Sequence, residues 1–318
     1  MKKRNKYKIN QSPLYKLNSH KKLSKCLGFE NDKTLQTLLK RGDDNYYISK
    51  LPSGRDIEVP KPQLSRMHRR LNKLLTRIEV PEYLNSGVKA RSNIKNARDH
   101  VGKHAVLKLD IKKFYPSVTQ QQIMRCFVKS FSCSKDIADT ISKLCTFTGY
   151  LPTGSAISQS LSYIVNRPIF DHINIYSKSR NIKFTCYVDD LTFSGTVIPK
   201  NFCSYITSYI KKNRNYNCHK IRIHKAGTPK LVTGAVIVGD TLKVKNKHRK
   251  RIHSLLHEYK VMVGRYQPED NELINYFQTL QGHLFSAAQV NSRYRQMGDI
   301  IVKRRRDLGV SALNQNTI

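Results

Sequence analysis

Two neighbouring aspartates stand between two apolar, β-prone segments in the stretch Thr185–Ser194. The flanking segments predict the two strands of a hairpin, with Asp189 and Asp190 at its tight turn. Adjacent carboxylates repel each other and resist burial, so this pattern is favoured where a divalent cation binds. For an isolated Asp-Asp pair a solvated acidic turn is the favoured interpretation, and only a second acidic strand favours a metal site.

The segment Ala105–Ile111 supplies that second strand, because its apolar run ends on Asp110. Alone, Asp110 is more often a strand-end cap or turn residue than a ligand. If the strand lies beside the hairpin, Asp110 faces Asp189. Three carboxylates on neighbouring strands could then hold two Mg²⁺ ions, of which one activates a 3′-hydroxyl and the other holds a triphosphate.

Other segments must position these acids, and their patterns predict several elements. We expect a hairpin over Asn45–Val59, followed by a helix whose apolar residues recur from Leu64 to Ile78. We expect further helices over Leu23–Lys40, Gln120–Ser130, Ser134–Phe147, Ser158–Ser177 and Pro199–Asn213. A basic strand is predicted at Lys220–Lys225, and another strand at Leu231–Val238, with which Leu242–Val244 could pair.

The charge of the chain predicts a polyanionic partner. It has 318 residues, with 58 Lys and Arg against 22 Asp and Glu, for a net charge of +36. Such an excess costs self-repulsion in the folded state, which nucleic acid or an anionic membrane surface would relieve. Residues 1–22 hold eight Lys or Arg and no acid, and predict an arm that is disordered in the free protein or laid on phosphate.

The composition also bounds the compartment. Seven cysteines with no metal-like spacing favour a reducing, cytoplasmic interior over a disulfide framework, with Cys126, Cys145 and Cys186 as core residues. No apolar run is long enough to span a membrane, and no apolar segment of a secretory signal follows the basic start. We therefore expect no membrane partner.

The acidic motifs resemble those of reverse transcriptases. Leu107–Val118 is similar to their first catalytic motif, and Tyr187–Asp190 is similar to their Tyr-x-Asp-Asp box. More narrowly, the chain resembles bacterial retron reverse transcriptases. Asn96–His100 matches the Asn-Ala-x-x-His signature of that family, and Val232–Gly234 matches its Val-Thr-Gly signature. The resemblance runs from about Gly54 to the last helix.

This resemblance implies an α+β right-hand polymerase fold, with fingers, a palm on an antiparallel sheet and a helical thumb. It divides the chain into a basic arm with helices at 1–44, fingers at 45–104, a palm at 105–244 and a thumb at 245–318. It implies RNA-directed DNA synthesis that uses Mg²⁺ and deoxynucleoside triphosphates. Asp110, Asp189 and Asp190 are then both the catalytic residues and the metal ligands.

The resemblance also implies six nucleotide-binding residues: Lys89, Arg91, Tyr115, Thr153, Gly154 and Lys225. An aromatic ring at the place of Tyr115 leaves no room for a 2′-hydroxyl in the family, although a core aromatic fits the sequence too. The loop around Thr153 departs from the family's Leu-Pro-Gln-Gly-x-Pro-x-Ser-Pro, because Thr replaces Gln and the prolines become Ala156 and Gln159. This departure puts the role of Thr153 in doubt. Lys89 and Arg91 fit a solvated basic loop equally well.

RNA binding is expected from the two signatures and the basic helical end. The residues concerned are Asn96, His100, Val232, Thr233, Gly234, Arg249, Lys250, Arg251, Lys303, Arg304, Arg305 and Arg306. For Asn96 and His100 the residues alone favour another reading, in which both satisfy buried backbone groups. A solvated basic bundle explains the apolar stripes of the last helices, but it does not explain their charge.

The retron resemblance implies a dedicated structured non-coding RNA as template and primer, and DNA synthesis from a guanosine 2′-hydroxyl. The product is a branched RNA–DNA hybrid, and the setting is defence against phage alongside an effector protein. Two alternatives remain: another stand-alone reverse transcriptase, of the group II intron or diversity-generating type, and a non-catalytic RNA-binding scaffold. The length, which predicts no additional nuclease domain, and the two signatures disfavour the first. The intact aspartates disfavour the second.

Overall fold

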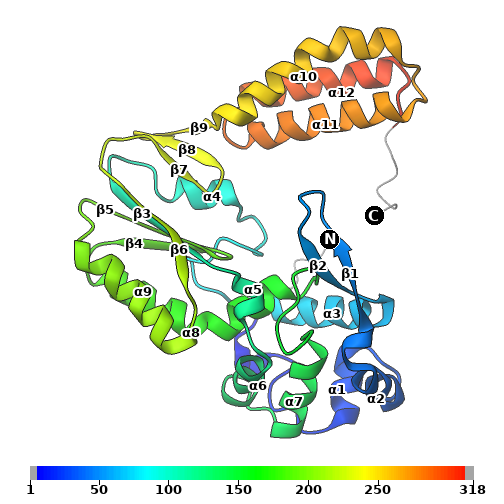
Figure 1. Cartoon of the computed structure of the whole chain (residues 1–318), viewed down its shortest axis with the longest axis vertical. Helices are drawn as coiled ribbons and strands as arrows, with labels where there is room; N and C mark the ends of the chain where they lie inside the picture. Colours follow the sequence, from blue (N-terminus) through cyan, green and yellow to red (C-terminus); the bar gives the residue numbers. More distant parts are fainter. Residues whose placement is uncertain (1–5, 312–318) are drawn as a thin grey trace. The chain divides into compact units, whose positions relative to one another are not determined.

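The computed structural model describes residues 6–311 (Figure 1). They divide into two compact units. The first runs to Ser92 and continues over Leu107–Ile223, and the second comprises Asn93–Val106 and the chain from His224 onward. The predicted border between palm and thumb, after residue 244, therefore lies inside the second unit.

The basic N-terminal segment is packed against the first unit from Lys6 onward. Leu14 and Leu17 are buried, the Tyr7 hydroxyl donates a hydrogen bond to the Leu74 carbonyl at 2.7 Å, and the Lys16 amide donates to the Phe131 carbonyl at 2.8 Å. The expectation of a disordered arm is wrong here, because apolar residues set among the lysines bury enough surface to offset the loss of chain entropy. Residues 1–5, on which that expectation also fell, lie outside the described residues.

Two short helices and a hairpin follow, as predicted. The elements are η1 Ile9–Gln11, α1 His20–Leu27, α2 Asp32–Arg41, η2 Gly42–Asn45, β1 Tyr46–Lys50, β2 Asp56–Pro60 and α3 Pro62–Leu75. Gly54 turns the hairpin with φ +79°, a left-handed conformation that glycine adopts without a steric penalty. Strands β1 and β2 are antiparallel, and Ile48 pairs with Glu58.

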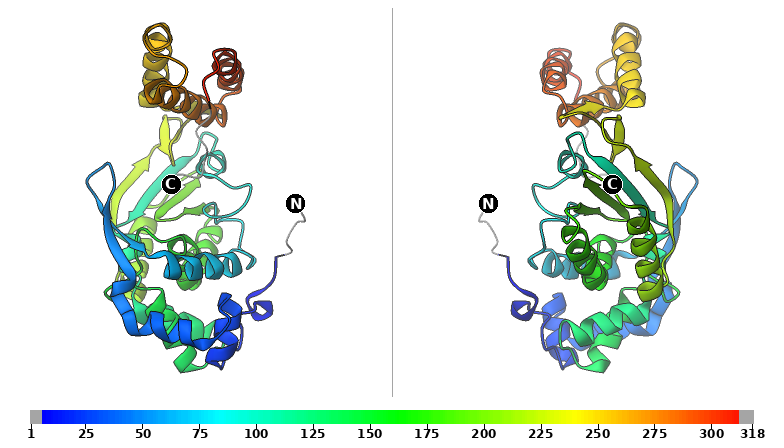
Figure 2. Two further views of the ribbon diagram at one scale, coloured as in Figure 1. Left: turned by 90° about the vertical axis from the view of Figure 1, so that its right-hand side faces the viewer. Right: turned by 90° about the vertical axis from the view of Figure 1, so that its left-hand side faces the viewer.

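A four-stranded sheet in the order β4-β5-β3-β6 carries the acidic segments. Its strands are β3 Ala105–Ile111, β4 Lys183–Tyr187, β5 Asp190–Gly195 and β6 Cys218–His224. Helices α8 Ser158–Lys178 and α9 Lys200–Arg214 pack against it, and the rings of Phe193 and Phe202 meet at 5.3 Å (Figure 2). Helices thus cover one face of the sheet. Alternate side chains of each strand point toward these helices, and the side chains between them point to the other face.

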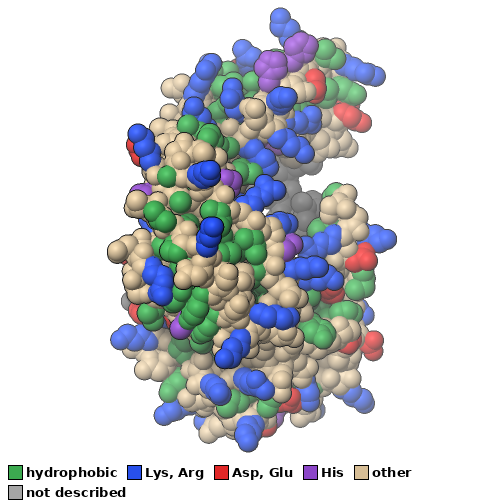
Figure 3. Space-filling model, turned by 60° about the vertical axis from the view of Figure 1, so that its left-hand side comes forward, with side chains coloured by type: hydrophobic (Ala, Val, Ile, Leu, Met, Phe, Trp, Pro, Cys, Tyr) green, Lys and Arg blue, Asp and Glu red, His purple; other side chains and the backbone are tan. Residues whose placement is uncertain are grey.

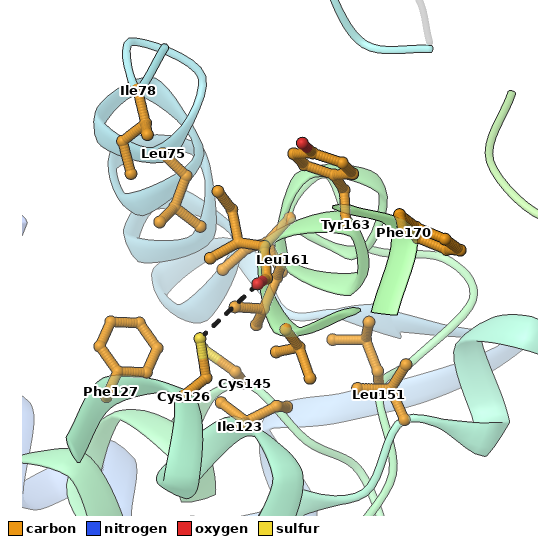
Figure 4. Close-up of a cluster of buried hydrophobic side chains, with 14 of the residues drawn as sticks. Leu75, Ile78, Ile123, Cys126, Phe127, Cys145, Leu151, Leu161, Tyr163 and Phe170 are labelled. Carbon is orange, nitrogen blue, oxygen red and sulfur yellow. Dashed lines mark hydrogen bonds between the residues drawn. The ribbon is translucent and has the colours of Figure 1, made fainter. Parts of the chain in front are cut away.

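Three further helices contribute to the core of the first unit, together with α3, α8 and the four-stranded sheet. These are α5 Phe114–Ser117, α6 Gln120–Lys129 and α7 Lys135–Leu144. Figure 4 shows the side chains of α3, α6 and α8 converging, with the Cys126 thiol 3.8 Å from the Ile164 carbonyl oxygen. Burial raises the pKa of the Cys126 thiol to about 12, and Cys145 and Cys186 are also buried. These cysteines are core residues, as predicted.

The second unit combines a short helix, a small sheet and a helical bundle. Its elements are α4 Asn93–Arg98, β7 Lys230–Val232, β8 Ala235–Val238, β9 Thr241–Val244, α10 Asn246–Arg265, α11 Asn271–Ala288 and α12 Arg293–Asp307. The single strand predicted over Leu231–Val238 is in fact a hairpin of β7 and β8. Thr233 and Gly234 form its turn with φ values of +38° and +97°, a conformation that no regular strand contains. The predicted pairing of β9 with the preceding strand is confirmed.

Helix α11 packs against both α10 and α12 around a core that includes Phe277, Leu280 and Leu284. Lys and Arg side chains are spread over the face drawn in Figure 3 and greatly outnumber acidic ones there. None of the helices within residues 6–311 has the length and apolar character needed to cross a membrane.

Candidate active site

The catalytic hairpin turns at Val188 and Asp189, because Tyr187 pairs with Asp190 across strands β4 and β5. Val188 has φ +59°, a conformation that costs a β-branched residue about 1–3 kcal/mol and persists only where the surroundings hold it. The Val188 amide donates a hydrogen bond to the Ser86 hydroxyl at 3.0 Å, which ties the turn to the chain after α3. The turn therefore holds both aspartates in one fixed place.

Asp110 lies beside this turn, as the sequence predicted. The amide of Ile111 donates to the Asp189 carbonyl at 3.0 Å, so the end of β3 is joined to the hairpin. The carboxylate of Asp110 is engaged from β6: one oxygen contacts His219 Nε2, and the other accepts from Lys220 Nζ at 3.0 Å. Sequence reasoning missed His219 and Lys220, since neither belongs to an acidic motif and only the strand order places β6 next to β3.

The three carboxylates share an electrostatic field. Burial, followed by the charges of Asp110 and Asp190, raises the pKa of Asp189 to about 6. The pKa of Asp190 is also raised, mainly by burial, although the Lys108 ammonium opposes the shift. Raised pKa values show that the protein alone does not fully compensate these negative charges.

Whether these residues fit divalent cations is decided by their chemistry. Within residues 6–311 no group of three or more His, Cys, Asp or Glu is gathered closely enough to hold a metal ion as it stands. His219 contacts the Asp110 carboxylate, and the Lys220 ammonium places a positive charge beside it. Partly desolvated carboxylates that lack sufficient countercharge are the hard oxygen donors that Mg²⁺ prefers. The donor set fits Mg²⁺.

Tyr115 is half-buried on α5 close to the catalytic hairpin. Burial, followed by the charge of Asp189, raises the pKa of its hydroxyl to about 12. Its ring also lies 5.9 Å from that of Phe114, at a tilt of 34°. Tyr115 thus belongs to the aromatic packing and also lies near the aspartates. A ring that limits the space beside a bound sugar must lie near the aspartates.

The other predicted nucleotide-binding residues have varied surroundings. Lys89 is exposed. Arg91 donates to the carbonyls of Pro81 at 2.8 Å and Leu84 at 2.6 Å, so its guanidinium braces a loop instead of standing free for a triphosphate. Lys225 lies beyond the end of β6, and the lysine of that strand in contact with an aspartate is Lys220.

The predicted template loop contacts the hairpin of strands β1 and β2. Both the amide and the hydroxyl of Thr153 donate to the Glu58 carboxylate, at 2.7 and 2.8 Å. The amide of Gly154 donates to the Glu58 carbonyl at 3.1 Å. Gly154 therefore serves a close approach between two backbone segments, where we had expected an approach to nucleotide.

The two family signatures contact each other inside the second unit. Asn93 Nδ2 donates to the Thr233 carbonyl at 2.9 Å, and the Thr233 hydroxyl donates back to the Asn93 carbonyl at 2.6 Å. Asn96 Nδ2 lies 3.4 Å from the Thr233 hydroxyl. Asn96, His100 and Val232 are each 0% exposed, so the direct RNA contact expected of them is corrected to a buried structural role, in which Asn96 contacts the β7–β8 turn. The tip of that turn, at Gly234, is exposed.

The basic residues of the last helices are mostly on the surface. Arg249, Lys250 and Arg251 are exposed on α10, as are Lys303, Arg304 and Arg306 on α12. Arg305 is only half-buried and donates to Gln281 Oε1 at 3.1 Å. A cavity of about 700 Å³ opens between β9, α10 and the start of α12, and Arg249, Lys250, Arg293 and Tyr294 are among its lining residues.

A sheet with three carboxylates at adjoining strand ends, covered by helices on one face, defines the palm of a right-hand polymerase. The sequence profile described as reverse transcriptase (RNA-dependent DNA polymerase) matches residues 48–225. The chain belongs to this family. The fold class that the sequence predicted is thereby confirmed.

The relatives are retron enzymes. The chain is 32% identical over 200 residues to the retron Se72 reverse transcriptase of Salmonella heidelberg (strain 579083-10), covering 60% of this chain and 51% of the relative. It is 27% identical over 172 residues to the retron Ec86 reverse transcriptase of Escherichia coli, covering 53% of each. The chain spans about half the length of these relatives. The apo telomerase of Candida tropicalis aligns with a TM-score of 0.47 at 12% identity, covering 83% of this chain and 62% of that chain.

Proposed function

We propose that this protein is an RNA-directed DNA polymerase of the retron type. The observation that carries the proposal is the placement of Asp110, Asp189 and Asp190 on adjoining strand ends of the palm sheet. The β1–β2 hairpin and α3 serve as fingers, the four-stranded sheet as palm, and α10–α12 as thumb. Deoxynucleoside triphosphates are the substrates.

Two Mg²⁺ ions would be held by Asp110, Asp189 and Asp190. Bound there, they supply charge neutralisation for the triphosphate and activation of the attacking hydroxyl. The chain's own residues position these ligands: Ser86 fixes the strained turn at Val188, and Ile111 fixes the Asp189 carbonyl. His219 and Lys220 hold the Asp110 carboxylate in place, and the Lys220 ammonium offsets its charge.

The RNA-binding surface combines the exposed thumb basic residues with the cavity between β9, α10 and α12. Arg249, Lys250 and Arg293 can neutralise phosphates, and Tyr294 offers a ring on which a base can stack. The buried Asn96 contributes indirectly, because it contacts Thr233 in the turn that exposes Gly234. Recognition of folded RNA depends on such shape and phosphate contacts.

RNA affinity should therefore fall steeply with salt. Each neutralised phosphate contributes a slope of about −0.7 to −0.9 in log K against log salt. Replacing Lys250 by Ala should reduce the slope by about one phosphate contact, whereas Lys33→Ala on α2 should leave it unchanged. Fluorescence anisotropy with a labelled RNA at several salt concentrations measures this. A flat dependence would show that the basic surface serves another partner.

The template and primer proposed here are one dedicated structured RNA. A 2′-hydroxyl of a guanosine in that RNA, held where a primer 3′-hydroxyl usually lies, becomes a usable nucleophile because the reacting groups are positioned together. The product is a branched RNA–DNA hybrid. We propose further that an effector protein completes an anti-phage defence system.

The test is expression of the protein with the RNA gene that neighbours its own gene. The nucleic acid product is then treated with ribonuclease and with a 2′,5′-debranching enzyme. DNA whose mobility shifts only after debranching supports the proposal. Free DNA ends before any treatment would indicate another type of reverse transcriptase, and no DNA at all would indicate an RNA-binding scaffold.

A further inference from the structure

The loop that precedes α8 is joined to the β1–β2 hairpin through a single acidic residue, Glu58. One carboxylate oxygen of Glu58 accepts two hydrogen bonds from Thr153, at 2.7 Å from the amide and 2.8 Å from the hydroxyl. The Glu58 carbonyl accepts a third, from the Gly154 amide at 3.1 Å. All three residues belong to the first unit.

The backbones meet too closely for any side chain at position 154. A Cβ atom there would lie 2.6 Å from the Glu58 carbonyl oxygen and 3.0 Å from Val59 Cγ2. Real Cβ atoms do not approach another atom as closely as 2.6 Å. The Glu58 carbonyl oxygen is a backbone atom, so it cannot move away without moving strand β2. The loop and strand β2 are therefore built to touch.

The carboxylate of Glu58 is ionised when it makes these contacts. Partial burial raises the pKa of Glu58, whereas the hydrogen bonds from the amide and hydroxyl of Thr153 lower it. The lowering prevails, so the pKa of Glu58 is below its ordinary value. Hydrogen bonds to a charged acceptor are about twice as strong as neutral ones. The contact is strong enough to restrain a loop.

The contact also occupies the only hydrogen-bond donor of the Thr153 side chain. In the family pattern the residue at this place is Gln, whereas the Thr153 hydroxyl here is directed to Glu58. A short side chain that already donates to a carboxylate has no second donor for a nucleotide or template. Any influence of residue 153 on the substrate must then pass through the position of the loop.

We propose that Glu58 is a positioning residue of the polymerase site, which fixes the Thr153–Gly154 segment so that the loop, and not the side chain of residue 153, selects the incoming nucleotide. This inference rests on the proposed function. Loosening the contact would let the loop move by fractions of an ångström, which is enough to weaken nucleotide binding and selection. Chemistry at the aspartates would be affected less.

Four variants test the contact. Glu58→Ala and Thr153→Val remove it in whole or in part, whereas Glu58→Gln and Thr153→Ser keep an acceptor or a hydroxyl. Asp56→Ala is the matched control, because Asp56 is an exposed acid two residues earlier on the same face of β2. The kinetic measurements are KM for a deoxynucleotide, kcat and the misincorporation ratio. A separate measurement is the hydrogen exchange of the peptide over residues 150–157.

Glu58→Ala should raise KM by about 10-fold, as expected for losing hydrogen bonds to a charged acceptor, with a smaller change in kcat. Exchange of the Thr153 amide should become faster, and misincorporation should rise. Thr153→Val should show the same changes more weakly, and Glu58→Gln should be intermediate because it keeps an acceptor oxygen but loses the charge. Thr153→Ser, which keeps both donors, should be closest to wild type.

Unchanged KM and exchange in both Glu58→Ala and Thr153→Val would overturn the inference. An equal loss in the Asp56→Ala control would do so too, because it would show a general charge effect on the hairpin. If Glu58→Ala does not fold, Thr153→Val decides, since it retains the amide contact. An inactive wild-type protein would refute the proposed function, whereas the exchange measurement tests the contact by itself.

Discussion

Replacing Asp189 by Asn should reduce nucleotide incorporation by on the order of 10³-fold, the cost of removing one group that stabilises transition-state charge. Asp189 lies at the turn of the hairpin, next to Asp190 and within the electrostatic field of Asp110. The amide of Asn has nearly the same shape but lacks the negative charge that a divalent cation needs. Primer extension at saturating Mg²⁺ measures the loss.

The same substitution should make the folded protein more stable in a chelating, metal-free buffer. The pKa of Asp189 is raised from 3.8 to about 6, so its ionised form is disfavoured in the folded state. The gain should be about 1–3 kcal/mol above pH 6, and it should vanish as the pH falls below 3.8, where Asp189 is protonated in both states. Thermal unfolding at several pH values measures it.

Asp139→Asn is the matched control, because Asp139 forms an ion pair with Lys143 at 2.7 Å on the surface of α7. It should leave extension unchanged. Extension by Asp189→Asn at a substantial fraction of the wild-type rate would remove the residue from the catalytic centre. Lost extension accompanied by lowered stability would point to misfolding instead.

Trimming Tyr115 to Val should raise ribonucleotide incorporation relative to deoxynucleotide by about 10- to 200-fold, the range for a pocket contact. The ring lies near Asp189, where the sugar of an incoming nucleotide would pass the metal ligands. Removing it opens space for a 2′-hydroxyl. The ratio of kcat/KM for the two substrates is the measurement.

Tyr115→Phe controls for the hydroxyl, because it keeps the ring and should retain discrimination. The packing of Tyr115 against Phe114 offers the competing explanation, in which the ring serves only the core. Under that explanation Tyr115→Val would lower stability and leave the substrate ratio unchanged. An unchanged ratio in an active variant would therefore exclude the steric role.

Much of the palm follows from local sequence. Alternating apolar residues around Asp189 and Asp190 predict a hairpin, and the apolar run before Asp110 predicts a strand, because the side-chain period of two depends only on neighbouring residues. Most helices were predicted from apolar residues that recur at helical spacing, and the core cysteines were predicted from their apolar neighbours, which are local patterns too. The basic thumb helices were visible in their charge and apolar stripes.

Long-range contacts decided the rest, because no local pattern encodes them. The family resemblance implied a triphosphate contact for Arg91 and an RNA contact for Asn96, whereas the fold directs Arg91 to backbone carbonyls and buries Asn96 beside Thr233, as the residue pattern of Asn96 by itself had favoured. The strand order placed Lys220 at Asp110. Hydrogen bonds between residues far apart in the chain depend on the packing of whole elements. The residue types thus determined the chemistry available, and the tertiary structure decided which side chains remain free to perform it.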